Sequence, residues 1–196
     1  MAKAIRTGKV KVQTINPRDF TTDIHRTVDD LPYGGGRAGM IIKVVPLVAA
    51  IRKAIGKKRA VGALIVLLAP SKKIFNQRMA AQFAKKYKHV VFICGRYEGI
   101  DARIEEYVDV KLSLGEFVLM GGEVAGLVML ESIIRLLPGV IGNEPSLGDE
   151  SYSQRFYLEY PQYTRPEVFE GKRVPKVLLS GNHKKITEWR QKHSQH

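Results

Sequence analysis

The segment CGRYEGIDARIEEY, residues 94–107, combines side-chain types that often carry chemistry. It holds the only cysteine of the sequence, Cys94, an arginine between a glycine and a tyrosine, and several carboxylates. These residues are compatible with a catalytic cluster, with a ligand-binding loop, or with an ordinary turn from a strand to a helix. A free cysteine is usually a small buried apolar residue. The thiol by itself therefore does not indicate a nucleophile.

Three segments that follow predicted strands have the composition of ligand-binding loops: LLAPS (67–71), CGRYEG (94–99) and SLGEFVLMGG (113–122). Glycines in these loops permit positive φ and a close approach of backbone to backbone or to a ligand. They are Gly95, Gly99, Gly115, Gly121 and Gly122. A tight turn is the better explanation of each glycine alone, but together the five glycines favour a shared ligand site. No P-loop or GxGxxG pattern is present, so a conventional nucleotide site is not indicated.

The elements that must position these loops are those of an α/β fold. VGALIVLLAP is a continuous apolar run, which is typical of a parallel strand covered on both faces. VVFIC and the segment Val108–Leu114 predict two further strands. Because strands alternate with helices, we expect a mostly parallel sheet with helices on both faces. Ligands bind such sheets beyond the carboxyl ends of the strands.

Two helices are predicted between these strands. Residues 46–55 begin with a proline, end with Arg52 and Lys53, and precede Gly56, which is favourable chemistry for both ends. Ser71 is expected to cap the second helix. Apolar residues recur in that helix every four positions and predict a core-facing stripe: Phe75, Met79, Phe83 and Tyr87.

The N-terminal part predicts one more strand and a long polar loop. VKVQTI, residues 10–15, alternates as a half-buried strand does, and Asn16-Pro17 ends it. The stretch from Phe20 to Met40 has no apolar period and carries four glycines in six positions, 34–39. Loops of this length in compact chains are usually functional or disordered.

The C-terminal part changes character along its length. A helix over about 123–137 is apolar nearly all round, so we expect it to be buried in a core or against a second subunit. Residues 143–156 are polar and predict an interdomain linker. Residues 157–196 are basic, carry the only tryptophan, Trp189, and are too short to fold well alone. The expected domains are therefore 1–142, the linker 143–156, and 157–196.

Composition limits the partner and the compartment. The 196 residues are 44% hydrophobic, which is enough for a core, and carry a formal net charge of +13. A strongly basic surface attracts polyanions such as nucleic acids. The longest apolar runs fall short of the roughly 18 residues that cross a bilayer, so no membrane association is expected. A single cysteine favours a reducing compartment, and we expect a cytoplasmic protein.

Several motifs occur together in a fixed order: NPRDF, HRTVDD, YGGG, GRYEGID, SLGEFVLMGGE, PGVIGNE, YPQYTRPE and VLLSGNH. In this order and spacing the sequence resembles the bacterial tRNA (guanine-N1)-methyltransferases of the knotted SPOUT class, over roughly Val10–His193. The resemblance implies a C-terminal deep trefoil knot in the α/β domain, followed by a short helical segment. It implies methyl transfer from S-adenosylmethionine to N1 of guanine 37, on the 3′ side of the tRNA anticodon.

The resemblance also assigns roles to individual residues. The cofactor lies in the knot, whose loops contribute main-chain groups and side chains. The implied cofactor-binding residues are Leu68, Ala69, Pro70, Gly95, Tyr97, Glu98, Gly99, Leu114, Gly115, Phe117, Leu119, Gly121 and Gly122. Cys94 is then a buried core residue.

The implied catalytic residues are an arginine and an acid. Arg135 is the arginine, although a cation at a helix C-terminus can simply complement the helix dipole. The base precedes a Ser-aromatic pair in GDESY and is either Asp149 or Glu150; counting from Gly142 favours Glu150, whereas the residue type favours Asp149. His25 and Asp29 are expected to hold the target base. Without the resemblance, an ordinary polar loop is the better explanation of these two residues.

The resemblance further implies Mg²⁺, a homodimer and tRNA as partners, with Glu98 as a contact to the cofactor or to the metal. No cluster in the sequence has the usual metal-ligand spacing. From Arg165 to His196 the chain carries eight Lys or Arg and three Glu, which suits contacts with RNA phosphates.

The sequence departs from the family pattern at four places. A strand and a helix are expected before Val10, and a helical RNA-binding domain is expected to continue beyond His196. The loop GGGRAGM is one residue longer than usual, and LLAPS lacks a polar residue before its proline. An alternative reading is therefore a cofactor- or RNA-binding module that has lost catalysis through truncation. A basic α/β domain without a cofactor is a third reading.

Overall fold

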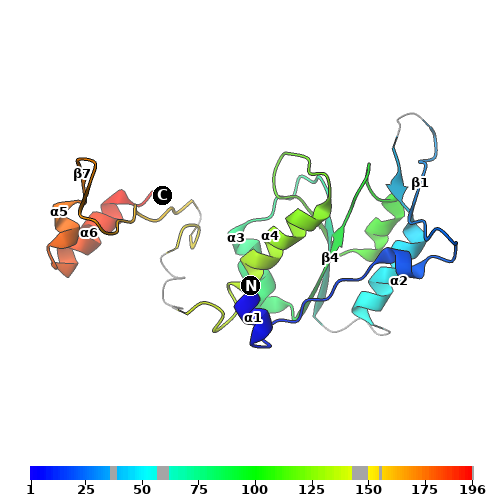
Figure 1. Ribbon diagram of the computed structural model, residues 1–196, viewed down its shortest axis with the longest axis horizontal. Coiled ribbons are helices and arrows are strands. Elements are labelled where there is room, and N and C mark those ends of the chain that lie inside the picture. Colours follow the sequence, from blue (N-terminus) through cyan, green and yellow to red (C-terminus); the bar gives the residue numbers. More distant parts are fainter. Residues whose placement is uncertain (36–38, 57–61, 143–149, 155, 196) are drawn as a thin grey trace. The chain divides into compact units, whose positions relative to one another are not determined.

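The computed structural model describes residues 1–35, 39–56, 62–142, 150–154 and 156–195. The predicted linker 143–156 lies largely outside the described residues. The chain divides into two compact units, Met1–Ile141 and Gly142–His196. Figure 1 shows the helices and strands of both units.

A parallel three-stranded sheet forms the centre of the first unit. Its strands are β3 (Ala63–Leu68), β4 (His89–Cys94) and β5 (Val110–Leu112), in the order β4-β3-β5. Leu68 at the end of β3 is in register with Cys94 of β4 and with Leu112 of β5. The carboxyl ends of all three strands therefore meet at one edge. The prediction of a parallel α/β sheet is confirmed.

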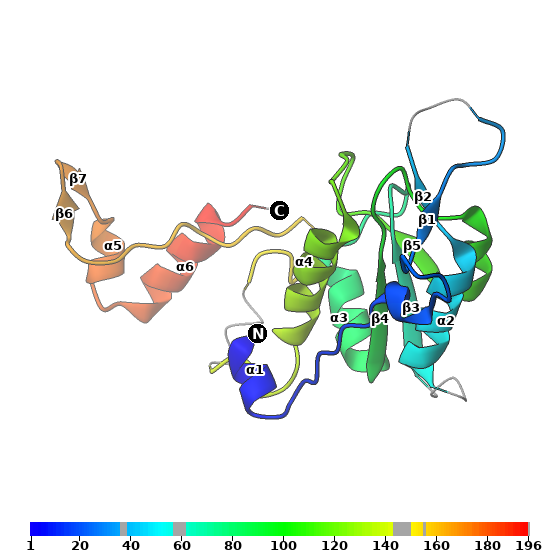
Figure 2. The same ribbon diagram turned by 45° about the vertical axis from the view of Figure 1, so that its right-hand side comes forward.

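Helices cover both faces of this sheet, as Figure 2 shows. They are α2 (Val44–Ile55) on one face, and α3 (Gln77–Lys86) and α4 (Gly122–Ile134) on the other. Alternate residues of β3 serve the two cores: Leu64, Val66 and Leu68 pack with α3 and α4, whereas Ile65 and Leu67 pack with α2. Every residue of β3 is buried, which explains its continuous apolar sequence.

The predicted helices exist, with corrections at their ends. Helix α2 begins two residues before Pro46 and ends at Ile55, and the C-cap Gly56 has a φ of +78°. Ser71 does not cap α3: Asn76 does, because its side chain accepts a hydrogen bond from the Met79 N–H. The aromatic and methionine stripe of α3 lies in the core, as predicted.

The predicted strand over residues 10–15 was wrong. The described residues provide no neighbouring strand for it, and Val12 is 45% exposed. Alternation produces a half-buried strand only where a sheet edge is available to pair with it. Instead, helix α1 (Ala2–Arg6) and a 3₁₀ turn, η1 (Pro17–Phe20), flank an extended segment.

The long polar loop is anchored by a short antiparallel pair. Strand β1 (Asp29–Asp30) pairs with β2 (Ile41–Ile42). Ile42 also forms a parallel bridge with Ile100. The polar loop is thereby connected to the chain that leaves β4, which continues into the 3₁₀ helix η2 (Ala102–Tyr107).

The third strand and the last helix of this unit are shorter than predicted. β5 spans only Val110–Leu112, because the next residue, Ser113, bridges to Ile74 instead of β3.

Helix α4 ends at Ile134 rather than near residue 137. It buries Met129 and Ile133, and its opposite face exposes an apolar set: Val124, Leu127 and Val128.

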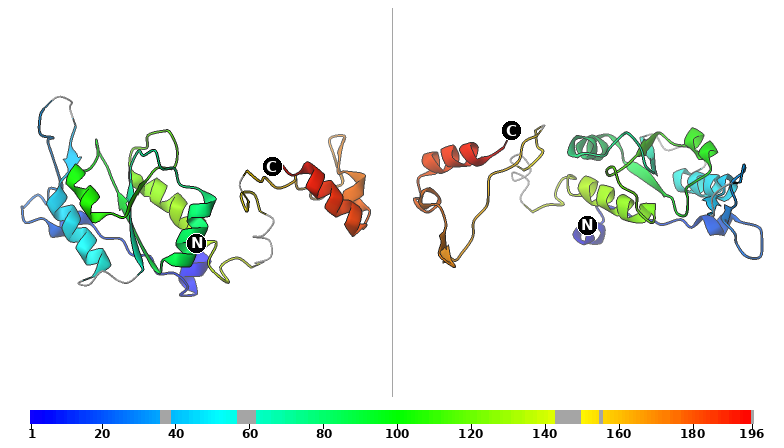
Figure 3. Two further views of the ribbon diagram at one scale, coloured as in Figure 1. Left: turned by 180° about the vertical axis from the view of Figure 1, so that it is seen from behind. Right: turned by 90° about the horizontal axis from the view of Figure 1, so that it is seen from above.

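The second unit is small. It contains the hairpin β6 (Val168–Phe169) and β7 (Lys172–Arg173), followed by α5 (Lys176–Leu179) and α6 (His183–His193). Trp189 stacks on His193 and contacts the rings of Tyr160 and Tyr163 edge-on. Figure 3 shows these elements from two further directions. No helix in the described ranges is long and apolar enough to span a membrane.

Candidate functional site

Two of the three predicted ligand loops meet directly beyond the carboxyl end of β4. The Gly122 N–H donates a 2.8 Å hydrogen bond to the Gly95 carbonyl oxygen. Arg96 and Gly121 form an antiparallel bridge beside this bond. The loop after β4 and the first turn of α4 therefore form one joint.

Position 122 has no room for a side chain larger than that of glycine. A Cβ atom added there would lie 2.8 Å from Cys94 Cα and 3.0 Å from Gly95 N. Contacts of this kind with backbone atoms cannot be relieved by a side-chain rotation. The double glycine is thus explained by close backbone approach within the joint.

Cys94 lies beneath this joint, within the core cluster of α3 and α4. Burial raises the pKa of its thiol to about 11, and the nearby Glu123 carboxylate adds to the rise. Because the thiolate is the nucleophilic form, the structure favours a core role for Cys94.

The first predicted loop lies beside the chain that leaves β5. The Ala69 N–H donates to the Leu112 carbonyl oxygen at 3.2 Å, and the Phe75 N–H donates to that of Ser113 at 2.9 Å. Leu68 is buried and Pro70 is exposed. The loop after β3 and the loop after β5 are therefore neighbours at the same sheet edge.

The third loop carries a cluster of apolar side chains. Leu114 is half-buried, and the Phe117 ring lies over Gly115, where a Cβ atom would be 2.6 Å from it. Phe117 and Leu119 are exposed, as are Val118 and Met120. The loop thus offers apolar surface close to Gly121 and Gly122.

The remaining residues of the loop after β4 connect it to the glycine-rich loop. Tyr97 has a φ of +61° and Gly99 one of +136°, both in the left-handed range. The Glu98 N–H donates to the Met40 carbonyl oxygen at 3.0 Å. A Cβ atom at Gly39 would lie only 2.2 Å from the Glu98 side chain. Gly39 therefore permits the two loops to pack closely.

The predicted substrate residues occupy different environments. His25 is exposed in a turn, and Asp29 is half-buried in β1, opposite Ile42. The Ile42 N–H donates to the Gly99 carbonyl oxygen at 3.0 Å. A short path of hydrogen-bonded backbone therefore leads from Asp29 to the predicted cofactor loop.

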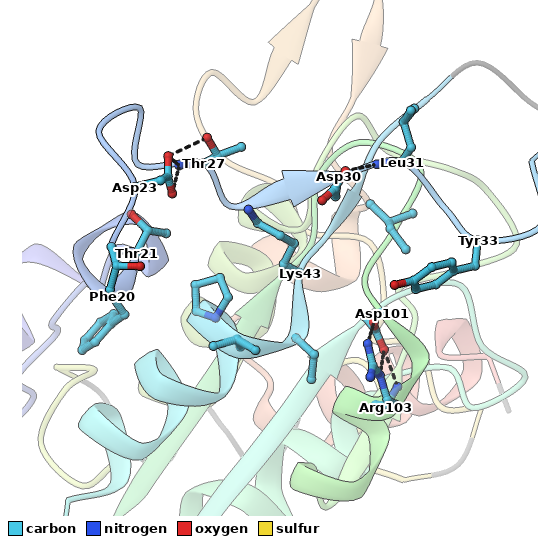
Figure 4. A pocket seen from close by; sticks show the side chains of 15 residues that line it. Phe20, Thr21, Asp23, Thr27, Asp30, Leu31, Tyr33, Lys43, Asp101 and Arg103 are labelled. Carbon is cyan, nitrogen blue, oxygen red and sulfur yellow. Dashed lines mark hydrogen bonds and ion pairs between the residues drawn. The ribbon is translucent and has the colours of Figure 1, made fainter.

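A cavity of about 450 Å³ adjoins this region. Figure 4 shows Asp23, which accepts a hydrogen bond from Thr27, on one side of the cavity and the hydroxyl of Tyr33 on the other side, with Lys43 between them. The ion pair of Asp101 and Arg103 forms another part of the wall. Arg103 lowers the pKa of the Asp101 carboxyl to about 2. None of the predicted site residues lines this cavity, which adjoins Asp29 through Asp30.

The predicted catalytic residues belong to different units. Arg135 caps the C-terminus of α4, where its N–H donates to the Glu131 carbonyl oxygen at 3.1 Å, and it is half-buried. Glu150 belongs to the second unit, where its carbonyl oxygen accepts from the Ser153 N–H at 3.0 Å. Asp149 lies outside the described residues.

Two charged residues at the joint were missed by the sequence reasoning. Arg96 Nε donates to Glu123 Oε1 at 2.6 Å. The available signal was their position, since each directly follows one of the glycines that form the joint. Within the described residues, no group of three or more His, Cys, Asp or Glu could hold a metal ion.

A parallel sheet flanked by helices, with two glycine-bearing loops that meet at its carboxyl edge, defines an α/β protein, and this edge is where such folds bind ligands. The profile of the family described as "tRNA (Guanine-1)-methyltransferase TrmD" matches residues 1–196. The chain belongs to this tRNA (guanine-1)-methyltransferase family.

Related proteins agree with this assignment. A "tRNA (guanine-N(1)-)-methyltransferase" of Dictyoglomus turgidum is 47% identical over 192 residues, which cover 98% of this chain and 76% of the relative. A protein with the same name from Clostridium perfringens strain 13 is 50% identical over 194 residues, covering 99% and 80%. One from Carboxydothermus hydrogenoformans is 48% identical over 195 residues, covering 99% and 74%.

Proposed function

We propose that this protein transfers a methyl group from S-adenosylmethionine to N1 of guanine 37 in tRNA. The observation that carries the proposal is the hydrogen-bonded joint of Gly95 and Gly122, in a chain that matches this family along its whole length. S-adenosylmethionine supplies an electrophilic methyl group attached to a sulfonium. The protein's own residues must bind this donor, orient the guanine and move one proton.

The residues proposed to hold the donor are those of the three loops. Main-chain groups of Gly95–Gly99 and Gly121–Gly122 lie close together, and the loop 113–122 adds apolar side chains. This combination suits a ligand with an adenine ring and a charged amino-acid end. Residues 69 and 75 form backbone hydrogen bonds with residues 112 and 113, so these two chain segments lie side by side. This arrangement supports the proposal of a trefoil knot at this edge.

Two groups on the protein are needed for the transfer. Guanine N1 carries a proton at neutral pH, so a base must remove it while N1 attacks. Negative charge then develops on O6, and a cation or donor stabilises it. We assign the cation to Arg135 and the base to Asp149 or Glu150. His25 and Asp29 are assigned to hold the guanine.

Other features support the proposed partners. The second unit carries basic side chains that can contact RNA phosphates, which position an RNA without reading its sequence. The exposed apolar face of α4, together with the exposed loop residues Val118 and Met120, supports a homodimer. We propose the first domain, 1–142, for the cofactor, the linker 143–156 for the base, and 157–196 for tRNA, in the cytoplasm. No step is assigned to Mg²⁺.

Methyl transfer to unmodified tRNA tests the proposal. Purified protein, labelled S-adenosylmethionine and a transcript with guanine at position 37 should give N1-methylguanine at that position, identified by nuclease digestion and mass spectrometry. A transcript with adenine at position 37 is the matched control and should remain unlabelled. Cofactor binding without methylation would instead support a binding module that lacks catalysis.

A further inference from the structure

The ion pair of Arg96 and Glu123 spans the joint between the loop after β4 and helix α4. The two residues are 27 positions apart, and Arg96 Nε lies 2.6 Å from Glu123 Oε1. Their side chains are 61% and 47% exposed. An ion pair with this exposure contributes only about 0–1 kcal/mol to the stability of a fold. Its position, however, is next to residues proposed to bind the cofactor.

The backbone around the pair is unusually glycine-rich. The loop runs from Gly95 to Gly99, and helix α4 begins at Gly122, directly after its N-cap Gly121. Gly121, the N-cap, provides no side-chain cap to α4. Glycines carry no Cβ atom and restrain their neighbours weakly. The charged pair is therefore a side-chain restraint at a joint that otherwise depends on backbone contacts.

Gly121 also makes room for the pair. A Cβ atom at this position would lie 2.4 Å from Glu123 Oε2, so the absence of a side chain allows the carboxylate to fold back over the backbone. Gly121 has an extended backbone with φ of −170°, which any residue can adopt. A side chain at position 121 would therefore displace the Glu123 carboxylate from its present place, although it would not clash with the backbone.

The pair remains ionised over the physiological range. Burial raises the pKa of the Glu123 carboxyl, but hydrogen bonds from Arg96 and from its own backbone outweigh this and lower it. The hydrogen bond to Glu123 raises the pKa of Arg96. Glu123 also lies in the first turn of α4, where a negative charge is favourable.

We propose that Arg96 and Glu123 are positioning residues that hold the loop Gly95–Gly99 against Gly121–Gly122 in the geometry that binds the cofactor. This inference rests on the proposed function. Small displacements of binding groups lower affinity or rate, whereas an exposed ion pair adds little to folding. The pair therefore acts on the cofactor site more than on the fold.

The test compares Arg96→Gln, Glu123→Gln and the exchanged pair Arg96→Glu/Glu123→Arg with the wild-type chain. Affinity for S-adenosylmethionine is measured by calorimetry, KM and kcat by methyl transfer, and folding by thermal unfolding. We expect each single variant to weaken cofactor binding and raise KM by about three- to tenfold. The value of kcat at saturating cofactor should change less than KM. The exchanged pair should recover most of the lost affinity.

Arg103→Gln is a matched control. Arg103 forms an ion pair of the same length, 2.6 Å, with Asp101, and its side chain is similarly exposed at 66%. That pair lies within one segment and does not cross the joint. We expect the cofactor affinity of Arg103→Gln to equal that of the wild type.

Two results would overturn the inference while leaving the proposed function intact. One is wild-type cofactor affinity in both single variants. The other is a loss of affinity that is matched by a loss of thermal stability, because the pair would then act through the fold. A wild-type chain that binds no cofactor would instead overturn the proposed function, and this inference with it.

Discussion

Arg135 is the residue to which the proposed chemistry assigns the developing charge on guanine O6. We expect Arg135→Ala to lower kcat by about 10²–10³-fold, the usual effect of removing one donor to a developing oxyanion. Cofactor affinity should stay within a few fold, because Arg135 lies at the far end of α4 from Gly122. Single-turnover methylation and calorimetry measure the two quantities. Unchanged turnover would refute the assigned role.

The identity of the base is decided by a paired substitution. Asp149→Asn and Glu150→Gln each remove one carboxylate and preserve shape. We expect one of them to lower kcat by about 10²–10⁴-fold, since a general base contributes that much, and the other to have little effect. In the variant with the lower kcat, the fall of kcat towards acidic pH, which reports protonation of the base, should disappear. Full activity in both variants would mean that the base lies elsewhere.

Cys94 provides a pH-dependent test of burial at the joint. With a pKa of about 11, compared with an ordinary 9.0, its thiolate is about a thousandth of the thiol population at pH 8. We expect slow alkylation by iodoacetamide at pH 8 and an increase of about tenfold per pH unit up to pH 10. The native fold favours the neutral thiol, so stability should decrease as pH rises from 9 to 11. A native alkylation rate at pH 8 equal to that of the unfolded chain would contradict this assignment.

At the scale of elements, the packing of α4 against the end of β4 determines whether the ligand loops meet. Gly122→Ala places a methyl group against the backbone of Cys94. We expect a loss of about 1–3 kcal/mol in the free energy of unfolding, as for other overpacked positions, and weaker cofactor binding. Gly142→Ala is the control, because a Cβ atom there meets nothing within 4 Å. Equal stability of the two variants, measured by denaturant unfolding, would disprove the close contact.

The same elements show what a sequence can predict. The strands β3 and β4 and helices α2, α3 and α4 were predictable because long apolar runs and four-residue stripes report directly on burial. The prediction of a strand over residues 10–15 was wrong, because alternating apolar and polar residues do not reveal whether a sheet edge is available for pairing. The prediction that Ser71 caps α3 was wrong, because the chain first runs alongside Ser113 and the helix begins only after Asn76. Contacts between distant segments, such as Arg96 with Glu123, leave no periodic signal.

At the scale of the whole molecule, the family assignment and the joint at the sheet edge support one function. The glycines after the predicted strands identified the loops, the resemblance assigned them to the cofactor, and the structure places two of them in hydrogen-bond contact. Their roles toward the cofactor remain a proposal. The cavity beside Lys43 and Tyr33 was not predicted, because its lining comes from separate short segments with no shared motif.

Calorimetric titration of the purified chain with S-adenosylmethionine tests the central claim most directly, because it requires neither tRNA nor turnover. The proposed site predicts saturable heat with one cofactor per chain, and a weaker interaction in Gly122→Ala than in Gly142→Ala. The absence of binding heat at high micromolar cofactor, in a chain shown to be folded by thermal unfolding, would contradict it.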